Sequence, residues 1–284
     1  LFQRGIIGPV QTLGQDLAWG DARMMREIIQ DMAARRGFGA VLASGILAAA
    51  RTFGPQAEAW AAQVKGLDLS GYVPDKAKGT ALGYAVSTRG GDFNTLYANM
   101  EYRWSRDQGE REFGDPESVN RFSPQGKGPL IRRSMLVNCV LDSLGLCKVP
   151  LLSLIGSFDL VHETALSAAV TGRQVDTQDL FALGERVAVL ERLFNLRFGA
   201  RAEDDDLPPM FWAGHAQSQR DGPPAQSWVL PMRDAFYACM GWDAQGRPEE
   251  TTLAGLGLNP LLDQSPQKRC AGLIRDETII LNMR

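Results

Sequence analysis

The chain has 284 residues, enough for one large domain or two smaller domains with real cores. Hydrophobic residues make up 44% of it and charged residues 22%, which is a globular composition and excludes extensive disorder. Thirty Lys and Arg stand against 33 Asp and Glu, giving a net charge of -3, so no basic surplus exists to bind phosphates. Nucleic acid is therefore not an expected partner.

The few histidines and cysteines exclude some kinds of metal site and disulfide-stabilised protein. His162 and His215 lie too far apart for a paired-histidine zinc motif. The four cysteines include no CxxC pair and are too few for a disulfide framework, which favours a reducing, cytoplasmic compartment. The longest apolar runs fall well short of the ~20 residues that cross a bilayer, so no membrane span is expected. The sequence opens without Met on what reads as a helix end at Gly5, and we interpret it as a fragment.

Helical periodicity dominates the first 66 residues. Asp21 is a candidate N-cap for an amphipathic helix that continues to Gly37. Apolar spacing predicts a second helix over residues 40–50, and Pro55 at a first helical position predicts a third that ends at Lys65-Gly66. Residues 67–132 are rich in Gly and Pro, which indicates loops and short helices, and the charged stretch 101–121 is expected to cross the surface.

Longer helices are predicted in the second half, over residues 131–144, 151–169 and 176–198. The last has a cap at Asp176 and an apolar stripe expected to face the core: Leu180, Leu183, Val187, Leu190, Leu193 and Phe194. Short helices are expected over 232–240 and 249–256, and only residues 278–281 suggest a strand. Alternating strands and glycine-rich phosphate-binding motifs are lacking, so the predicted fold class is all-α.

One candidate site follows the helix over 131–144, in the segment Asp142-Ser143-Leu144-Gly145-Leu146-Cys147. Gly145 can adopt positive φ and turn the chain so that the thiol of Cys147 and the backbone of Leu146 face away from the helix axis. Asp142 would supply a carboxylate acceptor on the same side. The alternative from the residues alone is a helix end with a buried structural cysteine.

The second candidate is the segment Ser87-Thr88-Arg89-Gly90-Gly91-Asp92. Its two glycines allow a close backbone approach, and the planar guanidinium of Arg89 suits a carboxylate or a phosphate. A surface turn with a solvent-facing Arg is the alternative. We also expect Lys65 to contact such groups, with a surface ion as its alternative.

These segments resemble the tungsten-dependent aldehyde:ferredoxin oxidoreductase family. Residues 142–147 (DSLGLC) resemble its DxxGLC motif, and residues 81–92 (ALGYAVSTRGGD) are similar to its ALGYATSTRGGDH segment. Further co-linear matches extend from the first residues to about Leu258: LAWGD at 17–21, VKGLDL at 64–69, ERLFNLR at 191–197, DDDLP at 204–208, GWD at 241–243 and LAGLGL at 253–258. The family assignment depends on this shared order and spacing.

The resemblance implies an oxidoreductase that oxidises aldehydes to carboxylates and passes two electrons through a [4Fe-4S] cluster to ferredoxin. Its metal is tungsten, or sometimes molybdenum, held between two pterins as tungstopterin. By the family motif, Asp142 would bind a pterin amine, Leu146 would contact the pterin through its backbone after Gly145, and Cys147 would be a cluster ligand. Arg89 is a further candidate cofactor-binding residue, and no catalytic residue is assigned.

Two departures from the family pattern matter. The family's other cluster cysteines and its first pterin motif would precede Leu1, so one candidate ligand remains, whereas a [4Fe-4S] cluster usually takes four thiolates. Cys139, Cys239 and Cys270 lack family counterparts and are interpreted as structural. Phe93 stands where the family has His, so the usual proton route is in doubt and a bulkier aromatic substrate gains plausibility.

The resemblance implies that residues 1–70 complete a helical middle domain and that residues 71–284 form a C-terminal helical domain contacting pterin and cluster. The expected partners are the missing N-terminal domain, ferredoxin or another redox protein, a small aldehyde or aromatic substrate, and further copies in an oligomer. Two alternatives stay open. One is the tungsten subunit of a benzoyl-CoA reductase-like complex, which shares these motifs, and the other is a non-catalytic helical scaffold.

Overall fold

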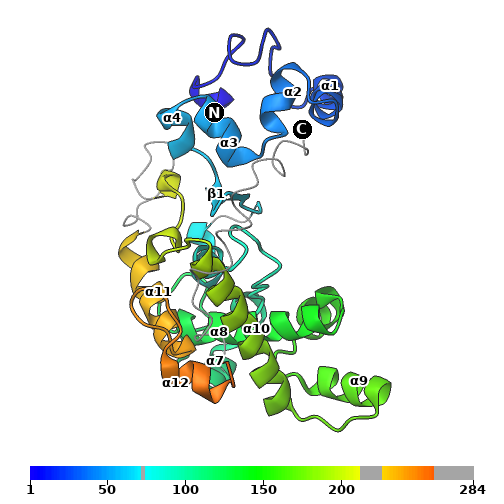
Figure 1. Cartoon of the computed structure of the whole chain (residues 1–284), viewed down its shortest axis with the longest axis vertical. Coiled ribbons are helices and arrows are strands. Elements are labelled where there is room, and N and C mark those ends of the chain that lie inside the picture. The colour runs from blue at the N-terminus through cyan, green and yellow to red at the C-terminus, as the bar shows by residue number, and fades with distance from the viewer. Residues whose placement is uncertain (72–73, 212–225, 259–284) are drawn as a thin grey trace, which may run out of the picture.

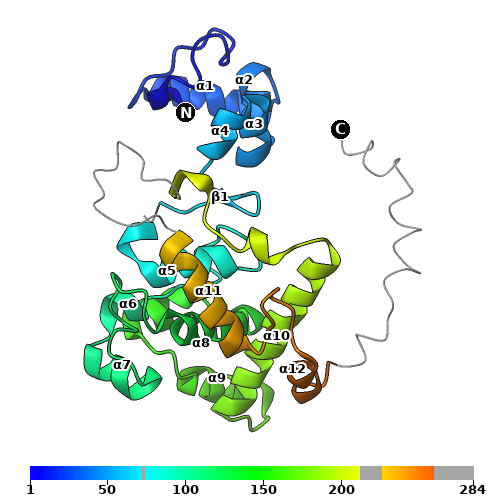
Figure 2. The same cartoon turned by 90° about the vertical axis from the view of Figure 1, so that its left-hand side faces the viewer.

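Two groups of helices joined by a short hairpin make up the fold (Figure 1). A computed structural model describes residues 1–71, 74–211 and 226–258. Helices α1–α4 form the smaller group at one end, and α5–α12 form the larger group at the other (Figures 1 and 2). The all-α prediction is confirmed, and no helix of the described residues is long and apolar enough to cross a membrane.

The N-terminal group begins with a single 3₁₀ turn, η1 (Phe2–Arg4), closed by Gly5 as expected. In α1 (Ala22–Ala33), the side chain of Asp21 accepts the Met24 amide at 3.0 Å, which confirms the predicted cap. The predicted helix over 40–50 is wrong, because α2 (Gly37–Leu42) and α3 (Ile46–Thr52) are separate. Gly45 adopts φ 86° between them, which no helix can continue.

The third predicted helix is also wrong in its second half. Helix α4 (Pro55–Ala59) ends at Trp60, and β1 (Gln63–Val64) then pairs antiparallel with β2 (Leu67–Asp68). Lys65 and Gly66 form the turn, with φ of 53° and 85°, the pattern of a tight two-residue hairpin. This hairpin joins the two helical groups (Figure 2).

Helix α8 (Lys127–Ser143) is the centre of the larger group, and it packs against α5 (Lys78–Val86), α10 (Thr177–Arg197) and α11 (Gln226–Met240). Residues 130–141 of α8 are almost all buried, so this helix is enclosed around most of its circumference. Gly184 of α10 lets the two backbones approach closely, since a Cβ there would lie 2.5 Å from the carbonyl oxygen of Leu136.

Shorter elements surround this core: η2 (Pro74–Lys76), α6 (Met100–Arg103), α7 (Arg106–Phe113), a π-helix η3 (Val149–Ile155), α9 (Val161–Thr171), η4 (Ala202–Asp204), η5 (Pro209–Phe211) and α12 (Glu250–Gly255). The helix predicted over 151–169 is divided, because Gly156 has φ 77° and Leu160 has φ 62°. The surface prediction for 101–121 is wrong at its start, since Glu101 is buried in an ion pair with Lys127.

Helix α10 begins at its predicted cap, where Asp176 and Asp179 form a capping box. Its apolar stripe, however, faces the core only in part. Leu180 is buried, whereas Leu183, Leu190 and Phe194 are 37%, 39% and 61% exposed. The core-facing side instead carries small residues beside the buried Arg192 (Gly184, Ala188 and Val189).

Candidate functional site

The turn after α8 has the conformation expected for residues 142–147. Gly145 adopts φ 67°, its amide donates to the Asp142 carbonyl at 3.2 Å, and the Leu146 amide donates to the Leu141 carbonyl at 2.9 Å. Any backbone contact from Leu146 to a ligand must therefore use its carbonyl. The side chain of Asp142 is 40% exposed and Cys147 is exposed, so both face outward and not into the core.

The structure brings the two predicted segments together. Arg89 donates through Nη2 to Oδ2 of Asp142 at 2.9 Å, although the residues are 53 positions apart. Lys148 donates to the same oxygen at 3.0 Å and also to the carbonyl of Asn94 at 2.5 Å. Oδ1 of Asp142 has no partner among the described residues. Sequence reasoning missed Lys148, whose position directly after Cys147 was the available signal.

Asp92 sets the direction of the Arg89 side chain. Its carboxylate lies 3.2 Å from Nη1 of Arg89. It also accepts hydrogen bonds from the hydroxyl of Thr95 at 2.6 Å and from the amide of Asn94 at 2.9 Å. The guanidinium thus bridges two carboxylates, one on its own turn and one at the end of α8, as a planar fork of donors allows. The turn at residues 87–92 is therefore fixed in place, and Arg89 is paired with carboxylates.

A cavity of about 230 Å³ opens beside this ion pair, between α8 and α10. Asn138 lies in its lining and is 1% exposed; its Nδ2 donates to the carbonyls of Leu96 and Ser134. Its Oδ1 is buried without a hydrogen-bond partner among the described residues. Since Glu191 and Asp142 also line the cavity, its chemistry favours a ligand that donates N–H or O–H groups.

The described cysteines differ sharply in environment. Burial raises the pKa of Cys139 to about 12, so this thiol stays protonated at neutral pH. Burial also raises the pKa of Cys239. Cys147 is exposed, whereas Cys270 lies outside the described residues. No group of three or more metal-binding side chains occurs in the described part of the chain, so these residues fit a contribution of one thiolate and not a complete cluster.

Phe93 and the two histidines were also considered in the sequence analysis, and the structure describes two of these three residues. Phe93 is half-buried and packs on Tyr97, with ring centroids 4.9 Å apart, and the Tyr97 hydroxyl lies 2.6 Å from Oγ of Ser153. His162 is exposed in the first turn of α9. His215 lies outside the described residues.

Lys65 contacts a carboxylate of this chain, and the alternative of a surface ion is wrong because its partners are internal. Its Nζ lies 2.6 Å from Oδ1 of Asp205. This fully buried carboxylate also pairs with Nη1 of Arg192 at 2.9 Å and accepts the hydroxyl of Tyr237. Burial lowers the pKa of Lys65, and the Asp205 charge offsets this in part. Sequence reasoning missed this buried network.

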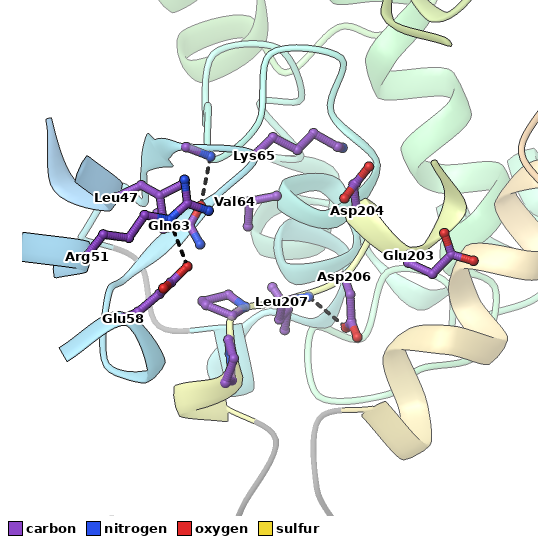
Figure 3. Close-up of a pocket in the computed structure, with 13 residues that line it drawn as sticks. Leu47, Arg51, Glu58, Gln63, Val64, Lys65, Glu203, Asp204, Asp206 and Leu207 are labelled. Atoms are coloured by element: carbon purple, nitrogen blue, oxygen red, sulfur yellow. Dashed lines mark hydrogen bonds and ion pairs between the residues drawn. The ribbon is translucent and has the colours of Figure 1, made fainter. Parts of the chain in front are cut away.

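A second cavity, of about 260 Å³, lies where the hairpin meets the segment around η4 (Figure 3). Arg51 and Glu58 approach it from the N-terminal helices and pair at 3.1 Å. The opposite wall carries carboxylates from Glu203, Asp204 and Asp206. The Lys65 side chain extends from the hairpin toward Asp204 (Figure 3).

Comparison with known proteins identifies the family. The family described as "Aldehyde ferredoxin oxidoreductase, domains 2 & 3" matches residues 1–258. The chain belongs to this family. The tungsten-containing aldehyde ferredoxin oxidoreductase of Pyrococcus furiosus is 31% identical over 268 residues, covering 91% of this chain and 40% of the relative. The similarly named protein of Pyrococcus horikoshii is 28% identical over 273 residues, covering 92% and 41%.

Other relatives broaden the comparison. The aliphatic sulfonate oxidoreductase, WOR-like subunit, of Pyrococcus furiosus is 25% identical over 280 residues, covering 91% of this chain and 38% of the relative. The solved active site complex BamBC of benzoyl coenzyme A reductase, in complex with 1,5 dienoyl-CoA, matches with a TM-score of 0.64 at 20% identity, covering 93% of this chain and 43% of that one. The structural match establishes a shared fold. The chain spans about 40% of the length of the curated relatives.

Proposed function

We propose that this chain is the C-terminal part of a tungsten or molybdenum pterin iron–sulfur oxidoreductase that oxidises aldehydes to carboxylates, with ferredoxin as electron acceptor. In this proposal residues 1–70 complete a helical middle domain, and residues 71–284 form the domain that contacts pterin and cluster. The family membership and the tungsten-containing relatives support the class of enzyme. We also propose that the protein works in the cytoplasm.

One observation carries the proposal: Asp142 and Cys147 both face outward from the single turn at Gly145. A carboxylate oxygen with no partner among the described residues can accept a pterin N–H, and an exposed sulfur can bind iron as a thiolate. Because Arg89 and Lys148 both bind Oδ2, they hold the carboxylate so that Oδ1 is left for the ligand. The candidate cofactor-binding set is thus Asp142, Gly145, Leu146, Cys147 and Arg89.

The adjacent cavity fits the same ligand chemistry. Its buried Asn138 Oδ1 requires a donor, and the amino-substituted ring of a pterin presents several. When bound, tungstopterin would supply the two-electron oxidation of the aldehyde and the cluster would carry electrons away. The residues of this chain would bind the pterin edge, contribute one cluster ligand and shield the cofactor from water.

Phe93 bears on the substrate. Its ring is held against Tyr97, which leaves an apolar side chain without a titratable proton next to the Asp92 turn. If this segment faces the substrate channel, an aromatic aldehyde would fit it better than a small polar one. We therefore place aromatic aldehydes first among the substrates to be tested.

The decisive experiment is analysis of the native full-length protein for tungsten, molybdenum and iron, with aldehyde-dependent dye reduction measured on the same preparation. The proposal expects one metal–pterin centre and Fe–S absorbance, with activity on an aldehyde. Asp142→Asn, which keeps the side-chain shape, should lower pterin content while the chain stays folded. Metal-containing protein that reduces an aromatic thioester and leaves aldehydes unreacted would favour the benzoyl-CoA reductase-like alternative, and metal-free protein would favour the scaffold.

A further inference from the structure

The buried network around Asp205 joins residues of three sequence segments, none of which is in the proposed cofactor-binding set. The side chains of Lys65 and Arg192 are 14% and 2% exposed, and Asp205 is fully buried between them. Arg192 also donates through Nε to the Gly246 carbonyl at 2.7 Å. This position needs an explanation, because burying three charges costs more than packing apolar side chains there.

Lys65 makes two further hydrogen bonds, which connect the Asp205 network to the segment that precedes Arg89. Its Nζ donates to the carbonyl of Ala85 at 2.7 Å and to that of Ser87 at 2.8 Å. These carbonyls belong to the end of α5, where helix geometry leaves acceptors without partners. An ammonium group satisfies them and complements the negative end of the helix dipole. Lys65 therefore fixes the backbone from which the Arg89 turn begins.

The hairpin holds the same turn from a second direction. The Gly91 amide donates to the carbonyl of Val64 at 3.2 Å. Gly90 has φ 99°, and a Cβ at this position would collide with the Val64 oxygen. The turn thus lies directly on the backbone of the residue that precedes Lys65.

Helix α10 holds the turn from a third direction. Asn195 donates to the Thr88 carbonyl at 2.6 Å, and the Thr88 hydroxyl donates to Glu191 at 2.6 Å. Both α10 residues flank Arg192, which joins this helix to Asp205 and so to Lys65. Every backbone segment around Arg89 is therefore anchored, while its guanidinium, 48% exposed, reaches Asp142.

We propose that Lys65 is a positioning residue for the candidate cofactor site: by holding the carbonyls of Ala85 and Ser87 it fixes the turn that directs Arg89 onto Asp142. The inference rests on the proposed function of Asp142. The segment at residues 64–69 would therefore affect cofactor binding indirectly, because Lys65 acts through Arg89 and does not touch the cofactor itself.

The test compares two variants of the native full-length protein that disturb the same buried carboxylate. Lys65→Met removes the bonds to Ala85 and Ser87 but leaves the Arg192–Asp205 pair. Tyr237→Phe removes a bond to Asp205 but leaves Lys65 in place. For each folded variant, tungsten, molybdenum and pterin per chain are measured together with Tm. We expect Lys65→Met to reduce cofactor content by about 10-fold or more at limiting cofactor supply, and Tyr237→Phe to retain it.

A double variant distinguishes a positioning effect of Lys65 through Arg89 from a general effect of Lys65 on the stability of the fold. If Lys65 acts through Arg89, adding Lys65→Met to Arg89→Ala changes cofactor content no further, because the pathway is already broken. Additive losses, equal losses in Lys65→Met and Tyr237→Phe, or full loading of Lys65→Met would each overturn the inference. Should Lys65→Met not fold, Lys65→Gln is judged by the same criteria. Wild-type protein without metal or pterin would instead refute the proposed function.

Discussion

The Nζ atom of Lys127 lies 3.3 Å from Oε2 of Glu101, and both side chains are completely buried. The Glu101 carboxylate also accepts the amides of Gly79 and Thr80 at 2.7 and 2.8 Å, which caps the first turn of α5. Lys127 in turn donates to the carbonyls of Ser118 and Asn120. The pair therefore joins α5, α6 and α8 through bonds that satisfy both charges.

Removing the cation of this pair should strongly destabilise the chain. Lys127→Met leaves the Glu101 charge buried without its counter-ion, a change that typically costs about 3–5 kcal/mol. Urea unfolding would measure the free energy of unfolding. The control is Arg23→Ala, which removes an exposed pair with Glu27 at 3.8 Å and should change little. Similar small losses in both variants would show that the buried pair contributes no more than a surface pair.

Close packing of α8 and α10 yields a prediction about two glycines. Gly184→Ala places a methyl group 2.5 Å from the Leu136 carbonyl oxygen, so the helices must separate, at a cost of about 1–3 kcal/mol. Gly255→Ala in α12 meets no atom within 4 Å and should be neutral or stabilising by up to about 1 kcal/mol. Thermal denaturation of the two variants measures the difference between their Tm values. An unchanged Tm in Gly184→Ala would contradict this packing.

Glu163 makes stability depend on pH. It is 1% exposed, neither carboxylate oxygen has a hydrogen-bond partner among the described residues, and burial raises its pKa. The folded chain then holds this proton more tightly than the unfolded chain, so stability falls as pH rises from the ordinary Glu pKa through the raised folded value.

Replacing the carboxyl of Glu163 with an amide should remove this dependence of stability on pH. Glu163→Gln carries no charge at any pH, so its Tm should exceed that of the wild type by about 2–4 °C near neutral pH. The difference should shrink as pH falls through the ordinary Glu pKa, because the wild-type carboxyl then becomes protonated in the unfolded state as well. Melting curves across this range provide the measurement, and a constant difference would exclude the carboxyl as its cause.

The cluster ligand can be tested by iron analysis. Cys147→Ser in the native full-length protein should lose most of the iron and the Fe–S absorbance, because a [4Fe-4S] cluster usually takes four thiolates. Cys239→Ser is the matched control, since that thiol is half-buried and burial raises its pKa. Wild-type iron in Cys147→Ser, or equal loss in both variants, would remove Cys147 from the ligand set.

Helix ends with a side-chain cap were predictable, and helix interruptions were not. Asp21 and Asp176 mark the starts of α1 and α10 because their carboxylates satisfy amides locally, over three residues. The breaks at Gly45 and Gly156 depend on a positive φ that a glycine permits but does not require. The hairpin was missed because its turn needs a positive φ at Lys65, and a lysine rarely adopts that left-handed conformation.

For the candidate site, sequence predicted the turn but not its partners. Gly145 and the order of residues around it indicated a helix end that presents Asp142 outward, and the structure has that turn. The pairing of Asp142 with Arg89 depends on how α8 packs against the end of α5, which no local pattern records. The partner of Lys65 could not be predicted, because the sequence does not reveal that Asp205 is buried.

The arrangement around Asp205 also restricts how the chain can diverge. A single anion lies between Lys65 and Arg192, so replacing it first would strand two like charges in the interior. A lineage can exchange one cation for a neutral residue and keep a balanced pair, but it cannot begin with the aspartate. Substitutions in this network should therefore begin with one of the two cations and not with the acid.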